Sequence, residues 1–201
     1  MLFGRKRLIA ALAMLLWFAA VGRGVHALLL YAYTPALTEP AAPTWPASLP
    51  SSAPRGLPLL VMFLHPHCAC SRASIAELAV LMASAQTRLE ARVYVVNVPG
   101  VAEDWVDTDL VRSAARIPGV TVSVDVDGRI ARQLGASVSG ETLMFSTSGL
   151  RVFRGGLTVA RGHEGANPGR YAVLDLLDDI DSRRPETPVF GCYLRESDAR
   201  P

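Results

Sequence analysis

The alternation of apolar and polar positions divides this chain into four segments of different character. Residues 1–33 are dominated by a long apolar run, and residues 34–56 are rich in proline. Residues 57–182 alternate short apolar runs with amphipathic stretches, and residues 183–201 form a mostly polar tail. A chain of 201 residues supports one domain of ordinary size with an appended segment, so we expect a single hydrophobic core within residues 57–182.

Within residues 57–182 the pattern predicts strands alternating with helices. Leu57 to Leu64 is a continuous apolar run, as in a strand buried on both faces. Ala73 to Leu89 spaces its apolar residues as on one face of a helix, and Arg92 to Val98 follows as a second buried strand. This order predicts a parallel pair of strands joined by a crossover helix. The remaining predicted elements are a helix over 109–116, a strand over 120–126, a short helix over 129–134, a hairpin of 141–145 with 150–153, and a helix over 168–180.

The first apolar run follows a basic cluster and is long enough to cross a membrane. Arg5-Lys6-Arg7 precedes apolar residues that continue from Leu8 to Leu30, with Arg23 as an interruption. At about 1.5 Å per residue, a helix of this length spans the ~30 Å hydrocarbon core of a bilayer. We interpret residues 1–33 as a signal-anchor, a retained transmembrane helix whose basic end stays in the cytoplasm. A cleaved secretory signal and a buried helix of a soluble protein are the alternatives.

The next segment, residues 34–56, is interpreted as a linker. Seven prolines lie between residues 34 and 58, separated mainly by Ala, Ser and Thr. Proline at this density disfavours helix and sheet and favours extended polyproline II. We therefore expect a semi-rigid spacer between the anchor and the globular domain.

Charge and cysteine content narrow the function classes. The formal net charge is +2 at pH 7 and the basic residues are scattered, so nothing indicates a nucleic-acid partner. The three cysteines cannot all be paired within one chain. Cys68 and Cys70 are separated by one residue, whereas Cys192 is isolated near the C-terminus.

Cys68 is the candidate nucleophile because it lies between a predicted strand and a predicted helix. The unpaired N–H groups and the dipole at a helix start favour a thiolate, the reactive form of cysteine. Protonated His65 or His67 would add to this effect. Cys70 is then the candidate resolving thiol. A disulfide across one intervening residue closes a small strained ring, so we expect it to be easily reduced and oxidising or isomerising in character.

Metal binding is the alternative at the same segment. His65, His67, Cys68 and Cys70 offer imidazole and thiolate ligands that suit copper or zinc. Four ligands on so tight a turn cannot all face one ion, so a subset such as Cys68, Cys70 and His67 is the candidate set. Cys192 or His163 could complete a site if the tail folds back. A scaffold that binds a partner without chemistry, with the cysteines merely filling space, is a third interpretation.

With these motifs the chain resembles the thioredoxin-like superfamily, especially its membrane-anchored bacterial branch of thiol-disulfide oxidoreductases related to cytochrome c maturation. This resemblance covers about Leu57 to Ile180. It rests on the apolar strand that enters Cys68, the turn Asp125-Val126-Asp127-Gly128 and the hairpin with Gly149. A narrower resemblance is to the RedB proteins. It rests on residues 65–74 (HPHCACSRAS), 155–156 with 161–165, and 189–192 (VFGC).

The resemblance implies an α/β fold, a thioredoxin-like three-layer sandwich with a central mixed sheet behind an N-terminal transmembrane helix. It implies thiol-disulfide exchange at Cys68 and Cys70 with thiols or disulfides of exported proteins. No cofactor is required, and copper binding stays open. The implied location is a bacterial inner membrane, crossed once, with the globular domain in the periplasm. The electron donor is not indicated.

Several further residues enter as supporting candidates. In this fold the connection after the last strand lies beside the cysteines, which makes Arg161, His163 and Glu164 candidates for substrate contact. Taken alone, such a charged glycine-rich loop is more often a solvated turn. Glu141 is interpreted either as a proton acceptor near Cys70 or as a surface carboxylate. Cys192 is interpreted as a second resolving thiol, a metal ligand or a free buried cysteine, and its isolation in a polar tail disfavours burial.

Two departures from the family pattern affect this interpretation. The family's redox motif is Cys-x-x-Cys, and here Ser71 stands where the second cysteine belongs. The family also has a cis-proline just before the hairpin, and residues 139–142 (SGET) contain no proline. We expect the loss of this proline to leave more access to the sulfurs, including access for a metal ion.

Overall fold

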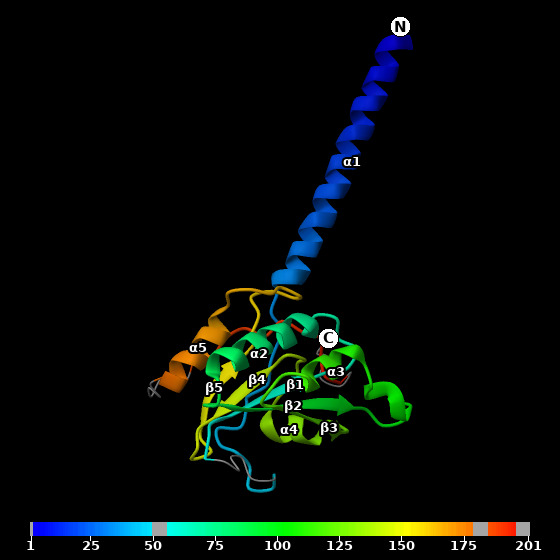
Figure 1. Cartoon of the computed structure of the whole chain (residues 1–201). Helices are drawn as coiled ribbons and strands as arrows, with labels where there is room; N and C mark the ends of the chain where they lie inside the picture. The colour runs from blue at the N-terminus through cyan, green and yellow to red at the C-terminus, as the bar shows by residue number, and fades with distance from the viewer. Residues whose placement is uncertain (1, 50–55, 179–184, 196–201) are drawn as a thin grey trace. The chain divides into compact units, whose positions relative to one another are not determined.

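A computed structural model of the chain describes residues 2–49, 56–178 and 185–195. These residues form two compact units, one before and one after the junction at Thr34 and Pro35. Figure 1 shows the first unit as one long helix and the second as a sheet with helices on both faces.

The first unit is helix α1, Leu2–Tyr33. Its part from Gly4 to Tyr33, 30 residues, is long and apolar enough to cross a membrane. Large apolar side chains such as Leu16 and Leu28 are exposed along it. Water is an unfavourable environment for so much apolar surface, whereas a hydrocarbon core accommodates it. The expected N-terminal apolar helix is confirmed.

The second unit is built on one five-stranded sheet with the order β3-β2-β1-β4-β5. Strands β1, β2 and β3 run parallel, β4 is antiparallel to β1, and β5 is antiparallel to β4. The sheet is therefore mixed, as expected. Its strands are β1 Leu59–Leu64, β2 Glu90–Asn97, β3 Val120–Val126, β4 Thr142–Phe145 and β5 Arg151–Gly155.

Helices cover both faces of this sheet and complete three layers. The helices are α2 Ser71–Ala85, α3 Asp109–Ala115, α4 Arg129–Leu134 and α5 Pro168–Asp178, with a 3-10 turn at Glu103–Val106. Apolar residues of α2, α3 and α5 share one buried cluster, and those of α4 belong to a second cluster on the opposite face. The predicted end of the last helix at residues 179–180 lies outside the described residues.

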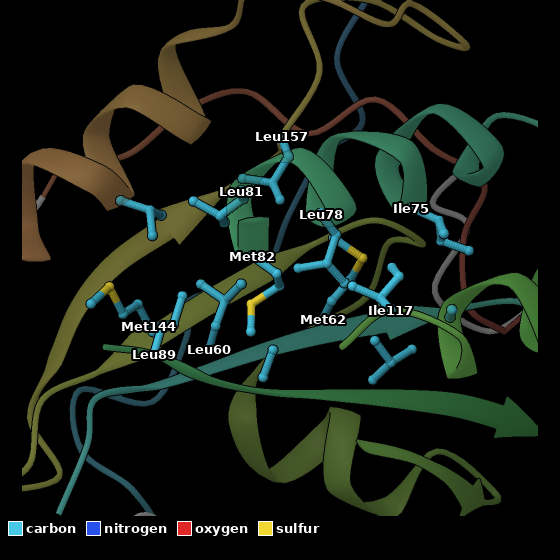
Figure 2. Close-up of a cluster of buried hydrophobic side chains, with 14 of the residues drawn as sticks. Leu60, Met62, Ile75, Leu78, Leu81, Met82, Leu89, Ile117, Met144 and Leu157 are labelled. Carbon is cyan, nitrogen blue, oxygen red and sulfur yellow. The ribbon is translucent and has the colours of Figure 1, made fainter. Parts of the chain in front are cut away.

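The central strand β1 explains both clusters. Because successive side chains of a strand point to opposite faces, Leu60, Met62 and Leu64 enter the first cluster and the alternate residues enter the second. Figure 2 shows Leu78 and Met82 of α2 packed over Leu60 and Met62. The continuous apolar run of β1 is thus required by burial on both faces. This packing fixes where β1 ends and α2 begins.

The proline-rich segment packs onto the domain in its described part, residues 35–49. The Trp45 N–H donates to the Gly149 carbonyl at 2.8 Å, and the Trp45 ring lies edge-on to Phe145 with centroids 5.3 Å apart. The Ala42 N–H donates to the Leu134 carbonyl at 3.1 Å. Apolar residues between the prolines therefore find partners on the domain, so residues 35–49 do not act as a spacer that stands clear of it.

Candidate active site

The three cysteines of the chain meet at the start of α2. The Sγ atoms of Cys68, Cys70 and Cys192 all lie within 4.8 Å of one another. The Sγ atoms of Cys68 and Cys192 are 2.8 Å apart. All three cysteines lie in the described part of the chain, and none of them is in a disulfide there. Residues 124 positions apart in sequence thus form one sulfur cluster.

The local chain places Cys68 at the helix entrance. After β1 ends, the Cys68 N–H donates to the His65 carbonyl at 3.1 Å, and the Ser71 N–H donates to the Cys68 carbonyl at 3.1 Å. Cys70 is the residue that precedes α2, with helical backbone angles of φ −64° and ψ −28°. Cys68 is 2% exposed. Its sulfur therefore lies in a protected position beside the unpaired N–H groups of a helix start.

Hydrogen bonds stabilise the thiolate of Cys68. They lower the pKa of Cys68 from 9.0 to about 4, the largest contribution coming from the Cys192 thiol, with further contributions from the side chain and N–H of Ser71 and the N–H of Cys192. Burial opposes this shift. The Cys192 N–H lies 3.4 Å from Cys68 Sγ. The lowered pKa favours the thiolate of Cys68 at neutral pH, the form required of a nucleophile.

Cys192 has the complementary state. Its pKa is raised by the hydrogen bond to Cys68, by burial and by the negative charge on Cys68 and Cys70, while Arg161 opposes the shift. Cys192 thus stays protonated, and its S–H group donates a hydrogen bond to the Cys68 thiolate. The pair therefore carries one negative charge and one proton.

Backbone pairing brings Cys192 to this position. Residues 189–195, here called the C-terminal strap, lie antiparallel to the segment before β4 through a bridge between Tyr193 and Val138. The Ser139 N–H donates to the Cys192 carbonyl at 2.8 Å. On the other side of the bridge, the Leu194 N–H donates to the Ser137 carbonyl at 2.9 Å. The position of Cys192 is thus fixed by main-chain hydrogen bonds.

Burial of strap residues anchors it further. Leu194 is fully buried in the second apolar cluster, and Phe190 and Val189 are also buried. Gly191 lies so close to the segment before β4 that an added Cβ would be 1.9 Å from the Ser139 carbonyl oxygen. Only glycine fits there without displacing the strap.

Ser71, the first residue of α2, has a structural and an electrostatic role. It is fully buried, and its Oγ lies 2.6 Å from the Oγ of Ser139. The Ser139 Oγ also accepts from the His65 N–H at 2.8 Å. The segment before β4 is therefore held by two serine hydroxyls. Among the described residues no cis peptide bond occurs.

The two histidines form an aromatic group with Trp105. The His67 Nε2 is 3.0 Å from the Trp105 carbonyl oxygen, and the His65 and Trp105 rings are 5.3 Å apart. Burial lowers the pKa of His65, with the charge of Cys68 opposing and His67 adding. The lowered pKa disfavours the protonated form of His65. Hydrogen bonds from Cys192 and Ser71 favour the thiolate of Cys68, and an added contribution from a protonated His65 or His67 stays a prediction.

Glu141 is buried in an ion pair. It is fully buried, so its interpretation as a surface carboxylate is wrong. Its Oε1 accepts from Arg154 Nε at 3.0 Å and from Nη2 at 2.9 Å. Its Oε2 accepts from the N–H groups of Ser137 at 3.0 Å and Val138 at 3.3 Å. Burial raises the pKa of Glu141, and these partners oppose the rise. Glu141 therefore holds the segment on which the strap pairs.

The loop at residues 161–165 is held by a carboxylate that the sequence did not single out. Glu77 of α2 is 3% exposed and accepts from the Gly165 N–H at 2.5 Å and from Asn167 Nδ2 at 2.9 Å. It also pairs with Arg170. The sequence offered one signal for its burial: an acidic residue beside the apolar stripe of a predicted helix. Of the loop candidates, Arg161 acts on the pKa of Cys192, whereas His163 and Glu164 are exposed.

A hollow of about 420 Å³ opens beside Cys68. It lies between the turn before α2 and the start of α3. Charged side chains of both signs, Arg72, Asp107 and Asp109, line it together with the apolar Leu110. The hollow borders Cys68, which itself is 2% exposed.

Comparisons with known proteins agree with the fold. No family model matches the chain, and no curated protein sequence matches it. An uncharacterised conserved protein of Geobacillus kaustophilus superposes with a TM-score of 0.56 at 15% identity, covering 81% of this chain and 92% of that one. A hypothetical protein of Sinorhizobium meliloti 1021 superposes with a TM-score of 0.57 at 17% identity, covering 81% and 96%.

The solved structures that match also include thiol-disulfide oxidoreductases at lower scores. A secreted disulfide oxidoreductase of Mycobacterium tuberculosis has a TM-score of 0.43 at 14% identity, covering 61% of this chain and 81% of that one. Likeness at these identities concerns the fold alone. The second unit of this chain has a thioredoxin-like fold, with a mixed five-stranded sheet of order β3-β2-β1-β4-β5 flanked by helices.

Proposed function

We propose that this protein is a membrane-anchored thiol-disulfide oxidoreductase that exchanges disulfides with exported proteins at Cys68. The observation that carries this proposal is a buried cysteine sulfur at a helix start with a second cysteine sulfur 2.8 Å away. Neither feature is needed for packing, because a small apolar residue would fill the same space. A stabilised thiolate next to a protonated thiol is the arrangement that disulfide exchange requires.

The reaction balances with protein sulfurs alone. The Cys68 thiolate attacks a partner disulfide, forms a mixed disulfide and releases one partner thiolate. A second thiol of the cluster then attacks Cys68 Sγ and expels the other partner sulfur, and its proton passes to a released thiolate. Two electrons move from the protein to the partner, and the reverse sequence oxidises partner thiols. Cys70 is the second thiol suggested by the Cys-x-Cys spacing, and its Sγ lies within 4.8 Å. The exchange uses no cofactor.

The proposed location follows from α1 and from the chemistry. A helix of this length behind the cluster Arg5-Lys6-Arg7 fits a single-pass signal-anchor with its basic end in the cytoplasm. Disulfides persist in oxidising compartments, which fits a domain in the periplasm of a bacterial inner membrane. The narrower kinship to RedB proteins is part of this proposal, on the motifs quoted above.

Copper handling is the second candidate, and the sulfur cluster supports it. Cys68, Cys70 and Cys192 offer three sulfurs within 4.8 Å, and soft thiolates favour Cu(I). This set differs from the one expected from sequence, because Cys192 takes the place of His67. The thiolate of Cys68 is ready for coordination without loss of a proton.

A redox titration separates the two candidates. The full chain, purified in detergent, is equilibrated with glutathione buffers of defined potential, with and without Cu(I), and its thiols are counted by alkylation and mass. We expect a reversible two-electron transition that disappears in Cys68→Ser. Thiols that stay reduced at every potential but bind Cu(I) tightly would replace the redox function by the copper function.

A further inference from the structure

We propose that the catalytic disulfide joins Cys68 to Cys192, so that the resolving thiol is supplied by the C-terminal strap and not by the Cys-x-Cys motif. This inference rests on the proposed function and names the second residue of the redox pair. It makes Cys70 dispensable for the two-electron cycle.

The distance between Cys68 and Cys192 favours a bond between these two sulfurs. The Sγ atoms of Cys68 and Cys192 are 2.8 Å apart, so a movement of under about 1 Å brings them to bonding distance. The Cys192 N–H also points at Cys68 Sγ, at 3.4 Å. The strap thus presents both its main chain and its sulfur to the nucleophile.

Backbone conformation disfavours a disulfide between Cys68 and Cys70. The N–H of Ser71 bonds to the carbonyl of Cys68 and the N–H of Arg72 to that of Ala69, at 3.1 and 3.3 Å, so the segment is already a helical turn. A disulfide across one intervening residue closes a small strained ring. Joining them would require this turn to open, and the start of α2 with it. Joining Cys68 to Cys192 leaves the turn intact.

The strap is rigid enough to act as a resolving element. It is fixed by main-chain bonds to Ser137 and Ser139 and by the buried side chains of Phe190 and Leu194. A thiol held beside its target reacts as if at very high concentration, because no freedom is lost on approach. Cys192 therefore attacks a mixed disulfide on Cys68 faster than an outside thiol.

The resolving step balances with the sulfurs of the pair. The Cys68 thiolate first attacks the partner disulfide and releases one partner thiolate. Cys192 then attacks Cys68 Sγ and expels the second partner sulfur, and the proton of Cys192 passes to a released thiolate. The products are the Cys68–Cys192 disulfide, one partner thiol and one partner thiolate.

The experiment compares Cys192→Ser with the matched variant Cys70→Ser in the full chain in detergent. Both are titrated in glutathione buffers, and oxidised samples are digested and mapped by mass spectrometry without reduction. We expect Cys70→Ser to keep the reversible transition and to yield a peptide pair linked through Cys68 and Cys192. We expect Cys192→Ser to lose the transition and to accumulate glutathione on Cys68. Circular dichroism checks that both variants are folded, and Cys192→Ala repeats the test with a different side chain.

The results separate this inference from the proposed function. A transition retained in Cys192→Ser overturns the inference, and its loss in Cys70→Ser would then assign the resolving role to Cys70 and leave the oxidoreductase function standing. Absence of both a transition and a glutathione adduct on Cys68 in the wild-type chain overturns the proposed function, and the inference with it.

Discussion

The sulfur cluster is assembled by two segments that differ in how they are held. The turn at residues 65–71 is local: it follows β1 directly, enters α2 and places Cys68 through hydrogen bonds over three residues. The C-terminal strap reaches the site from the far end of the chain and is held by pairing with residues 137–139. The local segment supplies the nucleophile, and the distant segment supplies the thiol that sets its charge.

This difference predicts that the two segments can be disturbed separately. Substitutions in the turn should lower the reactivity of Cys68. Substitutions in the strap should leave Cys68 able to form a mixed disulfide but slow the attack that resolves it. The following predictions test this separation.

The largest effect is expected from Gly191→Ala, which disturbs the strap alone. The added Cβ would lie 1.9 Å from the Ser139 carbonyl oxygen, so the strap must move. We expect the rate of intramolecular disulfide formation to fall by on the order of 100-fold, because the pre-organisation of Cys192 is lost. The rate is measured by rapid acid quench and alkylation of the remaining thiols. Gly22→Ala is the control, since Gly22 lies in α1, outside the second unit, and a Cβ there meets no atom within 4 Å. Equal rates in the two variants would contradict the role of the strap.

An intermediate effect is expected from Ser71→Ala, which disturbs the turn alone. Ser71 helps to lower the pKa of Cys68 to about 4, so its hydroxyl favours the thiolate. Loss of a hydrogen bond to a charged group costs about 1.5 to 3 kcal/mol, which raises the pKa of Cys68 by roughly one to two units. The alkylation rate of Cys68 should therefore begin to fall at higher pH than in the wild type. Ser123→Ala, at an exposed position of β3, should leave the pH profile unchanged. Overlapping profiles for wild type and Ser71→Ala would contradict this assignment.

The smallest effect on exchange is expected from Glu141→Gln, because Glu141 contacts the segment on which the strap pairs and not the strap itself. It removes the charge that pairs with Arg154 and weakens the support of Ser137 and Val138. Breaking a buried ion pair costs about 3 kcal/mol, so the free energy of unfolding in urea should fall by that order. We expect disulfide formation to slow by only a few-fold.

Glu77→Gln is the matched control for this prediction. Glu77 is an equally buried carboxylate paired with an arginine, but it supports the loop at residues 161–165. It should lose similar stability without slowing disulfide formation. Equal slowing in both variants would show that Glu141 acts through global stability and not through the strap.

Much of the fold follows from local sequence pattern. The apolar run of β1 and the spacing of apolar residues in α2 predict the strand and the helix on either side of Cys68. A strand buried on both faces is apolar at every position, whereas a helix buried on one face has apolar residues three or four positions apart. The candidate nucleophile could be found for the same reason. Its position at a strand-to-helix junction depends only on neighbouring residues.

The remaining features depend on contacts between distant segments, which leave no periodic signal. Cys192 meets Cys68 through main-chain bonds to Ser137 and Ser139, and main-chain pairing does not depend on a recognisable side chain. The polar character of the tail predicts solvent exposure, and Cys192 is exposed, whereas Phe190 and Leu194 on either side of it are buried. Similarly, the prolines before the domain indicated a spacer, whereas Trp45 packs on Phe145. Glu77 and Glu141 are buried through arginines far from them in sequence.

The most direct test of the central claim is a trapping experiment on the double variant Cys70→Ser/Cys192→Ser, in which Cys68 is the only cysteine. The full chain in detergent is mixed at neutral pH with a folded protein that contains an accessible disulfide. The adducts are then mapped by mass spectrometry. We expect one partner molecule per chain, held in a stable mixed disulfide at Cys68. A folded double variant that forms no adduct at Cys68 would contradict the assignment of Cys68 as the nucleophile and the oxidoreductase function with it.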